Sequence, residues 1–295
     1  MTDPVLLFRD ALQATFGPLN WLPVADGIIH RFRVPGDEAS TRYGWYVLHL
    51  EGIASGVFGN WKAASAWHHW SSRKPVDPME AQIIARRTEQ ARRHREAERH
   101  QRQQAAAIVA RRQWSSSGPA HPRHSYLIAK GCQPYGLRQS GSVLLVPLYL
   151  GRVLVNLQRI RSDGSKWFLS GGRVDGVYSP ISTPEPGQPL YVCEGWATGA
   201  TIHAETGFAV ACAMNAGNLL EAGRQLQRLY PDSPLIIAGD DDRRTEADGK
   251  GNAGWEAATR AAVMLGCGLV LPTWSGVEPL SLSDFNDLAS WRAAQ

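Results

Sequence analysis

Apolar and polar positions divide the last third of the chain into alternating strands and helices. Short runs of Leu, Ile, Val, Ala and Cys recur at residues 190–193, 208–213, 235–238 and 268–271. The segments between these runs favour helices, over residues 198–205, from Asn215 onward, and over 254–265. Strands that alternate with helices at this spacing predict a largely parallel sheet covered on both faces. We therefore expect an α/β domain with a central mostly parallel sheet over residues 183–295.

The segment before this domain has the pattern of an antiparallel sheet. Its apolar runs are β-branched or aromatic, and Asp163-Gly164 lies between two of them as a hairpin turn. A short helix is expected over residues 125–130, and strands over 143–148, 153–160 and 166–169. This predicts a basic, β-rich subdomain over residues 119–182.

Residues 76–118 favour one long helix. Residues 79–114 contain no Gly or Pro and are rich in Ala, Gln, Glu and Arg, with nine arginines and four glutamates. Such a helix would be about 50 Å long, and its middle has little apolar face for core packing. It is expected to be a solvated linker helix, or an arm that contacts phosphates or a partner protein.

Residues 1–75 predict a small α+β module. A helix is expected over residues 5–16, and strands over 28–34, 44–50 and 57–61. Trp61, Trp67 and Trp70 follow, with His68 and His69 among them. Such rings either pack in a core or stack on the bases of single-stranded nucleic acid. The two histidines have no evident third metal ligand nearby.

The charge of the chain is unevenly distributed. The formal net charge is +4, yet residues 183–295 hold seven basic and fourteen acidic residues, which leaves 24 basic and 13 acidic residues in 1–182. An acidic end joined to a basic body suits an enzyme that processes a polyanion, because the basic part neutralises phosphates and the acidic part holds metal. A chance distribution of surface charge is the alternative.

Acidic residues follow three of the expected strands. Glu194 follows the first run, Asp240, Asp241 and Asp242 follow the third, and Asp284 to Asp287 come after the last. The carboxyl ends of parallel strands meet at one sheet edge, where ligands bind. Gathered carboxylates repel one another unless a cation lies between them, and Mg²⁺ prefers such oxygen ligands.

Each carboxylate has an expected role. Asp240 and Asp242 are expected to bind metal side by side, with Asp241 pointing elsewhere or replacing them if the register differs. Glu194 is expected to be a third metal ligand or a general base. Asp284 and Asp287 are expected to hold a second metal directly or through water, or alternatively to cap a helix.

These motifs resemble a Toprim domain. Glu194-Gly195-Trp196-Ala197-Thr198-Gly199, then Asp240-Asp241-Asp242, then Asp284-Phe285-Asn286-Asp287 are similar in order to the Toprim primases of phages and plasmids. The similarity extends upstream through Lys130-Gly131, residues 145–148 and 156–160, and Gly171-Gly172. The resemblance covers residues 120–290, and less clearly 20–70.

The resemblance implies a DNA primase that makes short RNA primers on single-stranded DNA from NTPs, with Mg²⁺ or Mn²⁺. It implies that Lys130, Arg159 and Lys166 help to hold template and nucleotide. Arg243 and Lys250, in a polar segment expected to be a flexible loop, could hold triphosphate or be solvated. A Toprim nuclease and a non-catalytic nucleic-acid-binding adaptor are the alternatives.

Other features limit the function. No apolar run reaches membrane-spanning length, no secretory signal is visible, and the four cysteines lack Cys-x-x-Cys spacing. We therefore expect a cytoplasmic protein with reduced thiols and without the zinc ribbon of many bacterial primases. No Gly-x-x-x-x-Gly-Lys-[Ser/Thr] motif occurs, so a separate replicative helicase is the expected partner at a fork.

Overall fold

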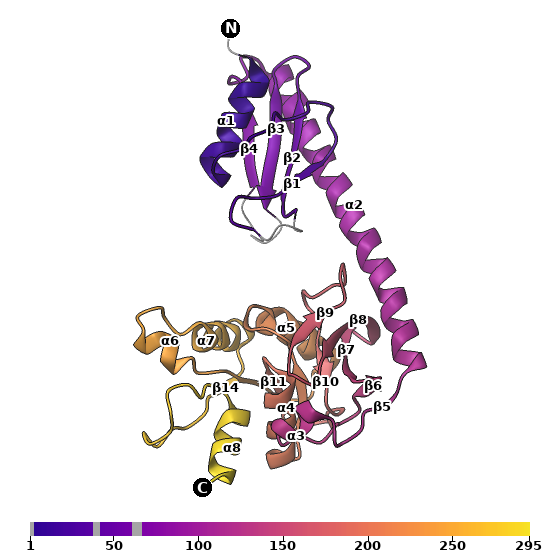
Figure 1. Ribbon diagram of the computed structural model, residues 1–295, viewed down its shortest axis with the longest axis vertical. Coiled ribbons are helices and arrows are strands. Elements are labelled where there is room, and N and C mark those ends of the chain that lie inside the picture. Colours follow the sequence, from indigo (N-terminus) through magenta and orange to yellow (C-terminus); the bar gives the residue numbers. More distant parts are fainter. Residues whose placement is uncertain (1–2, 38–41, 61–66) are drawn as a thin grey trace. The chain divides into compact units, whose positions relative to one another are not determined.

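The computed structural model describes residues 3–37, 42–60 and 67–295. The chain forms two compact units, Met1–Arg99 and His100–Gln295, and the long helix α2 (Pro78–Ser116) has residues in both (Figure 1). The predicted helix at 79–114 is therefore confirmed with slightly wider bounds. None of the helices in the described part of the chain is long and apolar enough to cross a bilayer.

The N-terminal unit is a four-stranded antiparallel sheet with a helix on it. After α1 (Pro4–Phe16), the strands β1 (His30–Phe32), β2 (Gly44–His49), β3 (Ser55–Asn60) and β4 (Trp67–Ser71) pair in sequence order. The period of two places Tyr46, Leu48 and Phe58 in one core with Phe8 of α1. Sequence reasoning missed β4, because its Trp and His residues were considered for ligand contacts instead.

The tryptophans of β4 serve packing. Trp70 packs edge-on against Phe8, with 5.2 Å between the ring centroids. Trp67 lies beneath the guanidinium of Arg95 in α2, 3.1 Å from the ring centroid, and the Trp45 ring is 4.4 Å from the same group. His68 stacks on Phe58. The described residues therefore favour the packing role for Trp67 and Trp70, while Trp61 lies outside the described residues.

The first half of the C-terminal unit is an antiparallel sheet. The strands β5 (Gly118–Pro119), β6 (Arg138–Ser140), β7 (Val143–Leu150), β8 (Val153–Ile160) and β9 (Lys166–Phe168) pair in sequence order, with α3 (Ser125–Ala129) beside them. Ala106 and Ala110 of α2 pack on one face of this sheet with Leu145 and Leu157. Small side chains on the helix allow this close approach.

The second half of the unit is a mostly parallel sheet. Its strands are β10 (Ser179–Pro180), β11 (Leu190–Cys193), β12 (Ala209–Cys212), β13 (Leu235–Ala238) and β14 (Gly268–Val270), in the order β10-β12-β11-β13-β14. Only β10 is antiparallel to its neighbour. The α/β fold with a central mostly parallel sheet is thus confirmed.

Helices cover both faces of this parallel sheet (Figure 1). Helix α4 (Trp196–Thr206) packs on one face with Cys193, Cys212 and Ala238. On the other face, α5 (Leu219–Leu229), which follows the short 3₁₀ turn η1 (Ala216–Asn218), and α7 (Ala253–Leu265) pack on Val192 and Ile237. Neighbouring residues of one strand thus supply both cores, because their side chains alternate between the faces.

Two details of the expected fold differ. The segment expected to be a flexible loop after Asp242 forms the short helix α6 (Arg243–Ala247). Asn215 does not cap its helix through its side chain. Instead the buried Asn218 bonds to Gly176, Val177 and Ala213 and so ties η1 to the strands.

Candidate metal centre at the carboxyl ends of the strands

The parallel register brings Glu194 and Asp240 to the same sheet edge. Cys193, the last residue of β11, pairs with Ala238, the last residue of β13. Glu194 therefore follows one strand directly, and Asp240 follows its neighbour after Gly239. The strands are apolar because helices cover both of their faces. The polar side chains follow at the strand ends, just beyond the covered region.

Asp240 is the most unusual group at this edge. Its Oδ1 is buried and has no hydrogen-bond partner. Burial raises its pKa to about 8, and the neighbouring carboxylates of Glu194, Asp284, Asp242 and Asp287 add to that shift. A buried carboxylate oxygen with no donor, surrounded by like charges, is the environment that a bound cation would stabilise.

Glu194 shares this environment. Burial raises its pKa, the carboxylates of Asp242 and Asp284 raise it further, and the ammonium of Lys166 opposes them. Its backbone carbonyl accepts from Met214 N at 2.8 Å, which fixes the turn after β11. Met214 has a positive φ of 72°, a conformation rare for a residue other than glycine.

Asp241 is turned away from its two neighbours. Its Oδ1 accepts from Asn252 Nδ2 at 2.7 Å, and its Oδ2 accepts from Trp274 Nε1 at 2.8 Å. Asp242 Oδ2 accepts from Gly254 N at 2.9 Å. Both oxygens of Asp241 are therefore satisfied by protein donors, as the alternation of side chains predicted, while Asp240 keeps an oxygen for a ligand.

Gly254 permits the close approach of α7 to the aspartates. A Cβ at this position would lie 2.8 Å from the carbonyl oxygen of Asp240 and 3.1 Å from Asp242 Oδ2. Asn252, which caps α7 by accepting from Trp255 N, also accepts from Asp242 N. The start of α7 thus holds the aspartate turn in place.

Asp284 reaches the same edge from the start of α8 (Phe285–Ala293). It caps that helix through Oδ1, which accepts from Asp287 N at 2.8 Å, and its Oδ2 accepts from the buried Thr198 Oγ1 at 3.0 Å. Asp287 is paired with Lys130, with 3.3 Å between Nζ and Oδ1. The capping alternative therefore describes Asp284, and a role in holding metal remains a prediction for both residues.

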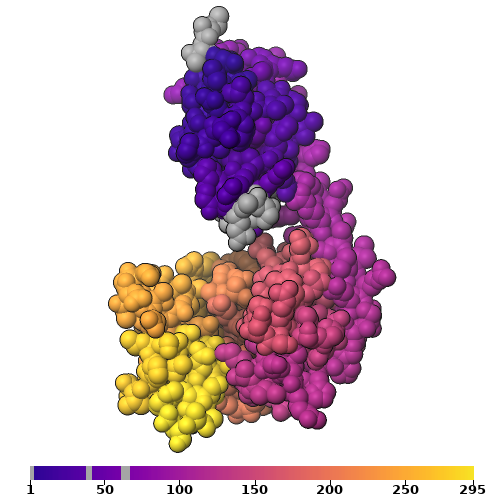
Figure 2. Space-filling view, in the orientation of Figure 1, coloured from indigo at the N-terminus to yellow at the C-terminus, as the bar shows by residue number. Residues whose placement is uncertain are grey.

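The segment between β14 and α8 is fixed against the aspartate turn. Arg243 donates to the carbonyl of Pro279 at 2.8 Å, and its guanidinium carbon lies 3.8 Å from the centroid of the Trp274 ring. Asp241 N donates to the carbonyl of Ser283 at 2.7 Å. In Figure 2 the last segment of the chain (yellow) lies against the segment that follows β13 (orange).

The basic residues predicted for this region do not all gather there. Lys166 lies over the Tyr126 ring at 5.3 Å and interacts with Glu194, Asp240 and Asp284. Arg159 lies on the opposite face of the same sheet, because it pairs with Trp167 while Lys166 pairs with Ile160, and it donates to Gln113 of α2 at 2.6 Å. The structure thus brings Lys166 to the carboxylates and directs Arg159 toward α2.

Arg243 and Lys250 have different surroundings. The guanidinium of Arg243 is used by Pro279 and Trp274, so it holds the protein's own loop. Lys250 is exposed in the turn after α6. Lys130 is engaged by Asp287, as described above.

Sequence reasoning missed the residues that hold the carboxylates, namely Thr198, Asn252 and Trp274. Asn252 stands just before a helix and could have been found as a cap. Thr198 belongs to the motif after the first strand, but its partner Asp284 could not be predicted, and Trp274 carries no local signal, since each meets its partner across a long separation in the chain.

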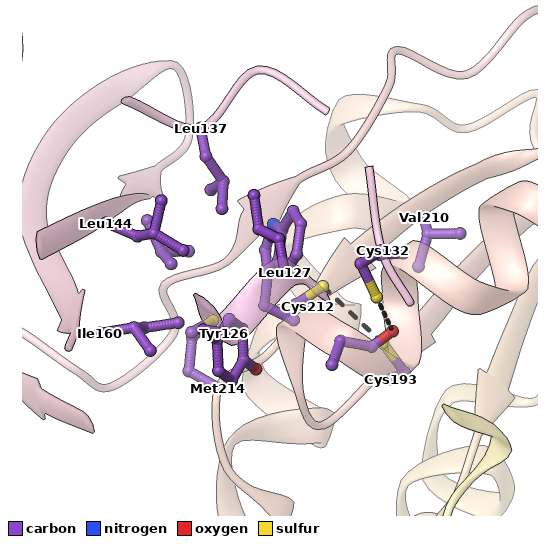
Figure 3. Close-up of a cluster of buried hydrophobic side chains, with 14 of the residues drawn as sticks. Tyr126, Leu127, Cys132, Leu137, Leu144, Ile160, Cys193, Val210, Cys212 and Met214 are labelled. Carbon is purple, nitrogen blue, oxygen red and sulfur yellow. Dashed lines mark hydrogen bonds between the residues drawn. The ribbon is translucent and has the colours of Figure 1, made fainter. Parts of the chain in front are cut away.

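A buried core lies directly beneath this edge. Cys193 and Cys212, paired on neighbouring strands, have 3.8 Å between their sulfurs, and Tyr126 and Leu127 of α3 pack in the same cluster (Figure 3). A Cβ at Gly199 would lie 2.5 Å from the Cys212 sulfur. Gly199 thus lets α4 approach the strands, which brings Thr198 to Asp284.

The donor set fits a cation that keeps much of its water. Among the described residues, no three His, Cys, Asp or Glu side chains are gathered closely enough to hold an ion by themselves. Mg²⁺ commonly takes only one or two carboxylates and keeps several waters. The free oxygen of Asp240, with Glu194 and Asp242 nearby, is suited to that kind of binding.

Comparisons with known proteins agree with the fold. Residues 189–294 match the family model of the Toprim domain. Two proteins named DNA primase TraC, both from Escherichia coli, are 29% identical over 86% of this chain and 30% identical over 87%. The chain spans only 24% and 18% of the length of these relatives.

A solved structure is similar at a greater distance. It contains bacteriophage T7 lagging-strand DNA polymerase with primase domains of two gp4 subunits bound to an RNA/DNA hybrid and dTTP. The match has 14% identity and a TM-score of 0.38, covering 58% of this chain and 88% of the other. The parallel sheet, its order of carboxylates and the family match together identify residues 189–294 as a Toprim domain, in a chain similar over most of its length to part of DNA primase TraC.

Proposed function

We propose that this chain is the catalytic part of a DNA primase. It makes short RNA primers on single-stranded DNA by metal-dependent nucleotidyl transfer, in phage or plasmid replication. The observation that carries the proposal is the buried, partnerless Oδ1 of Asp240 at the carboxyl end of β13, among carboxylates that raise its pKa. The similarity to DNA primase TraC selects primer synthesis among the reactions of Toprim enzymes.

The reaction joins a primer hydroxyl to the α-phosphate of a nucleotide and releases pyrophosphate. Asp240 and Asp242 would hold Mg²⁺ or Mn²⁺, and the ion would supply positive charge for the phosphates. Glu194 is either a third ligand or the base that accepts the hydroxyl proton. Its raised pKa suits a base, because proton transfer is most efficient when the pKa is near the working pH.

The remaining residues position the carboxylates and the substrates. Thr198 orients Asp284, and Asn252 with Trp274 holds Asp241 out of the centre. Lys166 is the basic side chain that supports nucleotide binding best, because its charge interacts with Glu194 and Asp240. The β-rich subdomain 119–182 carries it, next to the Toprim domain 183–295. Three weaker candidates already contact other parts of the protein, namely Lys130, Arg159 and Arg243. The fourth, Lys250, is exposed.

Several expectations complete the proposal. The template is single-stranded DNA, the nucleotides are NTPs, and the protein works in the cytoplasm with a separate replicative helicase. The long Arg-rich helix joins an N-terminal module 1–75 to the catalytic region.

Primer synthesis on single-stranded DNA tests the proposal. Labelled NTPs with Mg²⁺ or Mn²⁺ should give short products with the wild type, and Asp240→Asn should reduce them by about 100-fold or more. Asp248→Asn is the matched control, because Asp248 is exposed at the end of α6 and should leave the yield unchanged. Template cleavage without NTP incorporation would identify a nuclease instead. A folded protein with neither activity would favour an adaptor.

A further inference from the structure

A groove in the N-terminal unit combines stacked rings with arginines. It has a volume of about 430 Å³, and its described lining residues are Trp21, His30, Arg31, Phe32, Arg33, Arg42 and Tyr46. These described residues include three arginines and no Asp or Glu. The groove lies along β1, the edge strand of the four-stranded sheet.

The rings of the groove form a parallel stack. The Tyr46 ring lies 5.6 Å from the Trp21 ring at an interplanar angle of 19°, and 5.2 Å from the His30 ring at 18°. Tyr46 itself is buried, and its hydroxyl accepts from Val24 N at 2.9 Å. Trp21 and His30 are only half-buried, so ring surface remains at the groove.

Contacts within the protein hold the rings in place. Phe32 packs against Trp21 at 5.1 Å, and Asp26 accepts from His30 Nε2 at 2.9 Å. Rings held in this way lose little conformational freedom when a further ring stacks on them.

The arginines give the groove a positive rim. Arg33 donates twice to the carbonyl of Asp37, at 2.8 and 2.6 Å, and this neutral acceptor leaves the guanidinium charge in place. Arg42 is exposed just before β2. Arg31 also lines the groove but is paired with Glu98 at 3.4 Å, so Arg33 and Arg42 are the arginines considered for phosphate contacts.

We propose that this groove binds single-stranded DNA, with a base stacked on Trp21 or His30 and phosphates beside Arg33 and Arg42. An unpaired strand offers both partners, since its bases have free faces and its backbone is a polyanion. A duplex offers phosphates but keeps its bases stacked inside. The groove shares no residue with the carboxylate centre, and its binding of DNA does not require polymerising activity.

Binding of a labelled oligo(dT) to the full chain, in EDTA, tests the groove without any metal-dependent step. Trp21→Leu should raise the Kd by about fivefold or more, since it removes one stacking surface. Arg42→Gln should raise the Kd by severalfold. It should also reduce the slope of log K against log salt by about 0.7, the value expected for one lost phosphate contact.

Two matched controls accompany these variants. Arg260→Gln makes the same charge change at an exposed arginine of α7, and Trp255→Leu removes an exposed tryptophan of the same helix. Both should bind within twofold of wild type. Arg42→Gln is the decisive variant if Trp21→Leu does not fold, because Arg42 is exposed.

The comparison of DNA forms and a cross-link give separate evidence. A 5-iodouracil oligonucleotide should cross-link to the peptide that holds Trp21 or His30, and a duplex of equal length should bind more weakly. Wild-type binding by both groove variants, or equal binding of duplex, would overturn the proposal. If the groove variants lose binding while primer synthesis is never found, the groove stands and the primase proposal fails.

Discussion

The N-terminal unit buries a basic side chain, and the Toprim domain buries an acidic one. The basic side chain has partners within the protein, whereas the acidic one keeps an oxygen without a partner. Arg95 is 8% exposed, and burial lowers its pKa to about 10. Its guanidinium lies over the rings of Trp67 and Trp45, which interact favourably with a cation. Asp240 is also shifted by burial, yet its Oδ1 has no partner in the protein.

The difference separates a structural charge from a functional one. A buried charge that finds its partners inside the protein contributes to the fold. A buried charge that lacks them destabilises the fold until a ligand arrives, and such groups gather at functional sites. The comparison predicts that substitutions at the two positions have opposite effects on stability.

Asp240→Asn should show the largest effect and the clearest contrast. We expect a loss of activity of about 100-fold or more together with stability that is unchanged near pH 4 and increasingly higher than that of wild type as the pH rises to about 8, because a neutral amide avoids the repulsion with Glu194 and Asp242 without taking up a proton. Thermal unfolding of the metal-free protein measures the second effect. A marked drop in the melting temperature would show that the carboxylate has a structural partner.

Arg95→Leu should destabilise the N-terminal unit while leaving the carboxylate centre intact. The loss of ring contacts and of the packed side chain should lower the free energy of unfolding by about 1–3 kcal/mol. Urea unfolding checks this, with Arg93→Leu as the control at an exposed position on the same helix. Equal effects of the two substitutions would contradict a special role for the stacked guanidinium.

The stability of the metal-free protein should depend on pH through Asp240. Its pKa rises from an ordinary 3.8 to about 8 in the folded protein, so between these values the folded state holds a proton that the unfolded chain releases. Stability should therefore fall as pH rises from about 4 to 8, then level off. Melting temperatures across this range should show the decline in wild type and a weaker one in Asp240→Asn.

The same proton should compete with Mg²⁺. Metal binding needs the ionised carboxylate, so the affinity should rise by up to about tenfold per pH unit below pH 8. Calorimetric titration with Mg²⁺ at pH 6, 7 and 8 measures it. A pH-independent affinity would place the ion away from Asp240.

Trp274→Phe should have a smaller effect. It removes the Nε1 donor to Asp241 Oδ2, so the aspartate turn should be held less well, with about a tenfold loss of primer synthesis. The loss of stability should stay near 1 kcal/mol. Trp255→Phe, at an exposed tryptophan, is the control and should leave activity unchanged. A wild-type rate for Trp274→Phe would show that the loop does not position the carboxylates.

The contrast between Asp240 and Asp241 shows how far sequence reasoning extends. Alternation beyond a strand end predicts that neighbouring aspartates point in different directions, and the structure agrees. The sequence does not predict which side chain donates to Asp241, because Trp274 is 33 residues away in the chain. Likewise, β4 was missed because tryptophans suit a strand, a core and a stacking site equally well.

The sequence by itself determined the α/β sheet, the long helix and the order of the acidic residues, because these depend on periodicity and on local preferences of the chain. Only the tertiary structure decided which carboxylate lacks a partner, that Asp284 reaches Thr198, and that Arg159 lies on the opposite sheet face from Lys166. Those outcomes depend on strand register and on contacts between distant segments. A shift of one residue in pairing reverses the face of every side chain, so the face on which each residue lies follows from the pairing between strands and not from one strand alone.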